Sequence, residues 1–81
     1  MRKLLIGIHR AKGFVGEIYA LVTVGGEIIR QPFWSDDGDG WCCTSLFIDT
    51  NKSYEVVVVP SHAARSMYVR IDQEQQEKQR E

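Results

Sequence analysis

The sequence has few cysteines and no long hydrophobic run. Its two cysteines, Cys42 and Cys43, are neighbours in the chain. Neighbouring residues of a strand point to opposite faces, so these two are poor partners for a mutual disulfide, and a reducing cytoplasm fits best. The apolar run after Arg2 and Lys3 covers only residues 4–8, which is too short for a signal peptide or a membrane span. We therefore expect a cytoplasmic protein that does not bind a membrane.

Residues that carry catalysis or bind cofactors are also scarce. The histidines are His9 and His62, and no pair of histidines or cysteines has a chelating spacing. The glycine-containing segment 11–16 lies between two predicted strands, and it matches neither a phosphate-binding loop nor a dinucleotide fingerprint. We therefore expect no metal, no cofactor and no enzyme activity.

Charge is balanced in number and separated along the chain. The sequence has 10 basic and 11 acidic residues, for a net charge of −1. The basic residues of segment 1–15 have no acid among them, whereas segment 31–50 contains aspartates without lysine or arginine. Such polarity steers partners toward one side of a domain. General nucleic-acid binding is not favoured, because it calls for a clearly basic domain.

The length of 81 residues allows one domain. A chain of this size buries only about 60–65% of its unfolded surface, so either a well-packed sheet or oligomerisation must stabilise it. We expect a single β-rich domain over residues 1–72 and a polar tail over 73–81 that is helical or disordered. A homodimer is compatible with the small core.

Runs of β-branched and aromatic residues predict five strands. They cover residues 3–9, 17–24, 27–34, 41–48 and 54–59. Gly25 and Gly26 predict a two-residue hairpin, since glycine takes positive φ freely, and this turn places Val24 opposite Glu27.

Residues 62–72 fit two different elements. Ser61 is suited to cap a helix, and apolar residues at positions 64, 67, 68 and 71 have helical spacing. Met67, Val69 and Ile71 also alternate with Tyr68, Arg70 and Asp72, which indicates a sixth strand. The helix is the preferred interpretation. The predicted fold is α+β and mainly β, a five-stranded antiparallel meander or small barrel with a C-terminal helix.

Pairing across the hairpins divides the predicted strands into two faces. If Trp34 opposes Trp41, then Phe33 opposes Cys42 and Ile29 opposes Leu46. The core face then contains Ile18, Ala20, Val22, Ile29, Phe33, Cys42, Leu46 and Ile48. The second face contains Tyr19, Leu21, Ile28, Arg30, Pro32, Trp34, Trp41, Cys43 and Phe47. The second face is too apolar to remain in water, so we expect the helix, barrel closure or a partner to cover it.

An acidic loop between two tryptophans is the most distinctive segment. Trp34 and Trp41 enclose Asp36, Asp37 and Asp39. The aspartates match only a fragment of a calcium-binding loop, without its distal glutamate. The tryptophans can stabilise a hairpin and also contact a partner. The aspartates can keep the tip soluble or bind basic groups of a partner.

These features predict a small non-catalytic protein-binding module. We expect an inhibitor or adaptor, of the accessory type found in phages and mobile elements, that binds a basic partner surface. The predicted partner-binding residues are Trp34, Asp36, Asp37, Asp39, Trp41, Arg30 and Tyr19. The alternative is a small β-barrel that binds single-stranded nucleic acid through exposed aromatic residues and the basic N-terminal segment. The residues for this alternative are Arg10, Lys12 and Phe14.

Overall fold

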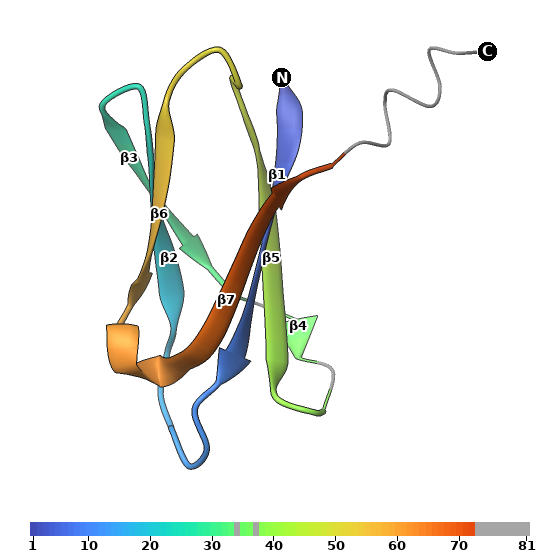
Figure 1. Cartoon of the computed structure of the whole chain (residues 1–81). Helices are drawn as coiled ribbons and strands as arrows, with labels where there is room; N and C mark the ends of the chain where they lie inside the picture. Colours follow the sequence, from blue (N-terminus) through green and yellow to red (C-terminus); the bar gives the residue numbers. More distant parts are fainter. Residues whose placement is uncertain (34, 37, 73–81) are drawn as a thin grey trace, which may run out of the picture.

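The computed structural model describes residues 1–33, 35–36 and 38–72. Over these residues the chain is almost entirely β-structure (Figure 1). The strands are β1 (Arg2–Arg10), β2 (Tyr19–Val24), β3 (Glu27–Pro32), β4 (Ser35–Asp36), β5 (Trp41–Ile48), β6 (Tyr54–Val59) and β7 (Ala64–Ile71). A short 3-10 turn, η1 (Ser61–Ala63), joins β6 to β7.

The strands form two antiparallel sheets that pack on each other as a sandwich (Figure 1). Sheet A has the strand order β4-β5-β1-β7, and sheet B has the order β3-β2-β6. The prediction of a mainly β domain is confirmed, whereas the meander is wrong and the described strands do not close into a barrel. The chain crosses from one sheet to the other after β1, β3, β5 and β6, so most consecutive strands are not paired.

The predicted C-terminal helix is wrong, because residues 64–71 form β7. This strand pairs antiparallel with β1, and the pairing places Val69 opposite Ile6 and Ile71 opposite Leu4. Alternation therefore turns Val69 and Ile71 inward onto the buried core. Ser61 begins only the three-residue turn η1. The open edge of β1 offers backbone hydrogen bonds along the whole segment, which an exposed helix would not use.

The strand register confirms one predicted hairpin and corrects another. Val24 lies opposite Glu27 across the turn at Gly25 and Gly26, as predicted. The β4–β5 pairing places Cys42 opposite Asp36, so the predicted opposition of Phe33 and Cys42 is wrong. The backbone N–H of Phe33 instead donates to the carbonyl of Ile18 at 3.4 Å. The chain leaves sheet B after Phe33, which breaks the continuous pairing that the prediction assumed.

The core lies between the two sheets, and its largest fully buried side chains are those of Leu4, Ile6, Ile8 and Val22. Of the predicted core face, Ile18, Ala20, Val22, Cys42 and Ile48 are buried, and Phe33 and Leu46 pack against the core. Ile29 is 36% exposed on the edge strand β3, and it lies in a different sheet from Leu46, so their predicted opposition is wrong.

The predicted second face does not exist as one surface. In a sandwich, the outer faces of the two sheets point in opposite directions. The members on sheet B are Tyr19, Leu21, Ile28, Arg30 and Pro32. The described members on sheet A are Trp41, Cys43 and Phe47, and Trp34 lies outside the described residues. The residues of the predicted second face are therefore divided between two surfaces on opposite sides of the sandwich.

Candidate binding face

Aromatic and basic side chains gather on the outer face of sheet A. Alternation along β1, β5 and β7 turns them away from the core. We call this set the aromatic face, and its members are Lys3, His9, Trp41, Phe47, Tyr68 and Arg70. They come from three strands that are distant in the sequence and adjacent in the sheet.

Tyr68 lies across the central strand at Gly7. In the register of sheet A, Gly7 stands between Cys43 on β5 and Tyr68 on β7. A Cβ atom at position 7 would collide with the tyrosine ring carbons Cε2 and Cζ, so the ring occupies the space that the glycine leaves. The ring is 41% exposed and forms the middle of the aromatic face.

Desolvation by partial burial raises the pKa of Tyr68 above its ordinary value, and the interaction with the neighbouring Cys43 side chain raises it further. Arg70 acts in the opposite direction and does not reverse the shift. Tyr68 is therefore a neutral hydroxyl at physiological pH, which suits a contact residue better than a general base.

Trp41 connects Tyr68 to His9. Its ring meets His9 edge-on, with centroids 5.0 Å apart and an interplanar angle of 83°. The centroid distance from Trp41 to Tyr68 is 6.0 Å, at an angle of 45°. Arg65 and Ser66 join His9 and Trp41 around a shallow hollow of about 260 Å³. These contacts fix the tryptophan on the sheet, so its binding to a partner would cost little side-chain entropy.

Two cations lie over rings of the same face. Lys3 Nζ is 6.0 Å from the centroid of the Phe47 ring, and Arg70 Cζ is 5.7 Å from that of Tyr68. Phe47 is 56% exposed. Exposed cation–π contacts contribute only about 0.5–1 kcal/mol each. Their main effect is to place positive charge beside open aromatic surface.

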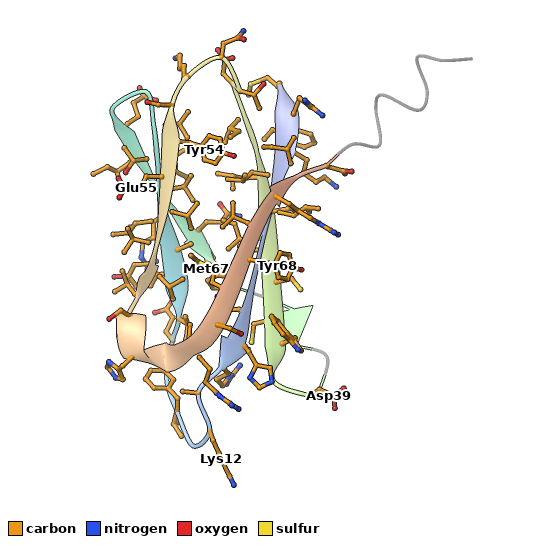
Figure 2. The ribbon with its side chains drawn as sticks, in the orientation of Figure 1. Lys12, Asp39, Tyr54, Glu55, Met67 and Tyr68 are labelled. Carbon is orange, nitrogen blue, oxygen red and sulfur yellow. The ribbon has the colours of Figure 1, made fainter. Side chains whose placement is uncertain are left out.

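The predicted partner-binding residues divide between opposite sides of the sandwich. Trp41 belongs to the aromatic face, and Asp39 is exposed in the loop that leads into β5 (Figure 2). Tyr19 and Arg30 lie on the outer face of sheet B, where Arg30 Cζ is 3.9 Å from the tyrosine ring centroid and Arg30 Nη2 is 3.4 Å from Glu17 Oε2. Trp34 and Asp37 lie outside the described residues, and the structure describes only the backbone of Asp36, in β4.

The predicted nucleic-acid-binding residues lie at one end of the sandwich. Arg10 Nη2 donates to Cys42 Sγ at 3.3 Å, and the Phe14 ring meets His62 edge-on at 5.6 Å between centroids. These two side chains therefore help to close the end of the core. Lys12 is exposed at the tip of its loop, at the same end of the molecule as Asp39 (Figure 2).

Sequence reasoning did not select five members of the aromatic face as site residues. The predicted helix over residues 62–72 includes Tyr68 and Arg70, and a helix does not place these side chains beside β1. The alternation of residues 66, 68 and 70 with Met67 and Val69 was the signal that could have placed them on one strand face. The remaining missed residues are Lys3, His9 and Phe47.

Comparison of the chain with protein-family models, with curated proteins and with solved structures gives no match. Among the described residues, no three histidine, cysteine, aspartate or glutamate side chains are placed to hold a metal ion. That part of the chain also has no helix with the length and apolar character needed to cross a membrane.

Proposed function

We propose that the protein is a small non-catalytic module that binds a protein partner through the aromatic face, as an inhibitor or adaptor does. The observation that carries this proposal is the grouping of Trp41, Tyr68 and Phe47 with Arg70 on one outer sheet face. Tryptophan, tyrosine and arginine are the residues most enriched among interface hot spots. The sheet beneath them gives a rigid base, so the face is organised before the partner arrives.

The acidic loop supports an extension of this interface. Asp36, Asp37 and Asp39 precede Trp41 by a few residues in the sequence, and Asp36 pairs with Cys42 at the end of sheet A where Trp41 lies. We infer that these carboxylates bind basic groups of the partner, while Lys3 and Arg70 bind acidic groups at the other end. Opposite charges at the two ends of one apolar surface would set the orientation of the partner and raise its association rate.

Phe47→Glu should reduce the capture of the partner at least tenfold. Phe47 is 56% exposed and has no role in the buried core, so its replacement removes contact surface and adds a charge that must be desolvated. The measurement is quantitative affinity capture from the source cells, followed by titration of the recovered partner. Ile28→Glu is the matched control, because Ile28 is 68% exposed on the opposite side of the sandwich.

Thermal melting monitored by circular dichroism should show that both variants remain folded. Equal loss of the partner with the Ile28 variant, or full retention with the Phe47 variant, would place recognition outside the aromatic face. Replacing Asp36, Asp37 and Asp39 together by asparagine in the same assay should weaken the complex and flatten its salt dependence. Unchanged binding by this variant would leave the loop with a solubilising role only.

Single-stranded nucleic acid is a second candidate ligand, favoured by the cations beside exposed rings. Sheet faces that bind single strands stack bases on aromatic residues and hold phosphates with lysine and arginine. Tyr68 with Arg70 and Phe47 with Lys3 provide two such pairs. The net charge of −1 weighs against strong general affinity.

Fluorescence anisotropy with a labelled oligothymidylate at low salt tests this candidate. If the single strand is the ligand, Phe47→Ala should weaken binding by about 1–3 kcal/mol, the cost of one lost stacking contact. Arg30→Ala should leave the affinity unchanged, because Arg30 lies on the other sheet. The absence of binding at micromolar protein would discard the nucleic-acid function and leave the protein-partner proposal intact.

A further inference from the structure

One lateral side of the sandwich is closed and the other is open. On the closed side, Gln31 of β3 reaches across to β5, where its Nε2 donates to Thr44 Oγ1 at 3.2 Å and to the carbonyl of Ser45 at 3.1 Å. On the other side, β6 is the edge of sheet B and β7 is the edge of sheet A. Among the described residues, β6 pairs only with β2, and β7 pairs only with β1 (Figure 1).

Apolar side chains in core register reach solvent along this open side. Tyr54 pairs in register with Val24, and Met67 pairs with Ile8, so both stand at inward-facing positions. They are nevertheless 40% and 45% exposed, and they appear in the space between the ribbons of β6 and β7 (Figure 2). Val57, at an outward position of β6, is 46% exposed. A fully formed sandwich would bury the first two.

We propose that a second copy of this chain closes the open side by strand pairing. In this arrangement β7 of each copy pairs antiparallel with β6 of the other copy, about a two-fold axis parallel to the strands. Sheet A of one copy then continues into sheet B of the other, and their outer faces coincide. The pairing is antiparallel because the chain reverses direction at η1, so β6 and β7 run in opposite senses (Figure 1).

Charge selects one register for this pairing. Arg70 is an outward residue of β7 and Glu55 an outward residue of β6, and both are exposed. With Glu55 opposite Arg70 of the other copy, Val57 lies opposite Tyr68. A shift by two residues places Glu55 opposite either Asp72 or Tyr68, and a shift by one residue turns inward side chains outward.

The same register matches every inward pair by polarity. The inward side chains of both strands are apolar, and all six residues of β6 gain a partner on β7. The inward pairs are Tyr54 with Ile71, Val56 with Val69, and Val58 with Met67. The outward pairs are Glu55 with Arg70, Val57 with Tyr68, and Val59 with Ser66.

Self-complementarity favours a second copy over another occupant. A two-fold interface uses the same residues twice, so the β6 edge and the β7 edge of each copy are covered at once. Pairing of β7 with a second β7 would leave β6 open, and β7 contains no acidic residue to face Arg70. Exposed edge strands also attract unwanted pairing, which a closed dimer prevents.

The test is the molar mass of the full 81-residue chain by light scattering over a range of concentrations. The wild type should have twice the 9.3 kDa mass of one chain. Glu55→Arg and Arg70→Glu should each raise the dimer dissociation constant at least tenfold, because each places like charges opposite one another. The double variant Glu55→Arg/Arg70→Glu should restore the dimer, because it exchanges the two charges.

Glu27→Arg is the matched control, because Glu27 is an exposed acid on β3, away from the open side. Its dimer should remain intact. A monomeric wild type, a double variant that stays dissociated while folded, or dissociation of the control would overturn the proposal. Hydrogen exchange gives a reading without variants, since amides of β6 and β7 should gain protection as the wild-type concentration rises.

This inference does not rest on the proposed function, and the two can fail separately. Glu55 is not a member of the aromatic face. A monomeric Glu55→Arg variant should therefore still capture the partner, whereas Phe47→Glu should still form the dimer.

Discussion

Replacing Gly7 with valine should lower the free energy of unfolding by an amount near the upper end of the range of about 1–3 kcal/mol that overpacking costs. Any Cβ at this position collides with the Tyr68 ring, and the branched valine side chain adds further volume in the same space. The ring must then leave its place between Gly7, Cys43 and Trp41, which also removes its contact with the Trp41 ring. For a domain of this size, each kcal/mol lowers the melting temperature by about 4–8 °C, so thermal and urea melts will resolve the effect.

The same substitution made together with Tyr68→Ala tests the cause. Truncation of Tyr68 removes the three atoms that lie nearest to a Cβ at position 7. A β-branched residue in a strand is then favoured over glycine. Gly7→Val should therefore be neutral or stabilising in the Tyr68→Ala protein. A double-mutant cycle should give a coupling of at least about 1 kcal/mol. Additive effects would mean that Tyr68 does not occupy the space above Gly7.

The structure could be predicted best where the residues of one short segment determine its conformation. The β2–β3 hairpin depends on Gly25 and Gly26, which adopt positive φ values of 56° and 91°. Their chemistry selects the turn, and the turn then sets the register of Val24 with Glu27. No distant residue is needed for this step.

The local sequence pattern of residues 64–71 did not distinguish a helix from a strand. Met67, Tyr68 and Ile71 fit a helical stripe, and Met67, Val69 and Ile71 also fit a strand face. The decision comes from β1, whose open edge pairs with the segment and whose Leu4 and Ile6 help to bury Ile71 and Val69. That edge is distant in the sequence, so no window around the segment contains it.

The candidate site was hard to predict for the same reason. Trp41 could be selected from the composition of its loop, but its ring neighbours His9 and Tyr68 come from β1 and β7. The crossings between sheets decide which aromatic residues share a face. Because of these crossings, Tyr19 and Arg30 lie on sheet B, whereas Lys3 and Arg70 lie on sheet A with Trp41.

Ile6→Ala should have the largest effect on stability, a loss of about 2–5 kcal/mol. Ile6 is fully buried in β1, which has β5 on one side and β7 on the other. Its side chain packs in the same cluster as Leu4, Val22 and Ile48, so truncation leaves a cavity between the two sheets. A domain of this length has a total stability of only about 4–12 kcal/mol, so the loss takes a large part of the total.

Urea unfolding of wild type, Ile6→Ala and Ile6→Val at one fixed protein concentration tests this expectation. The concentration must be fixed because dimer formation would add to the apparent stability. Ile6→Val removes one methylene and should cost only about 0.5–1.5 kcal/mol. An alanine effect no larger than that of valine would contradict a core centred on β1.

Because β1 also holds Lys3, Gly7 and His9, the aromatic face is lost when this strand unfolds. Ile6→Ala should therefore weaken partner capture in proportion to the unfolded fraction, whereas Phe47→Glu weakens it in a folded protein.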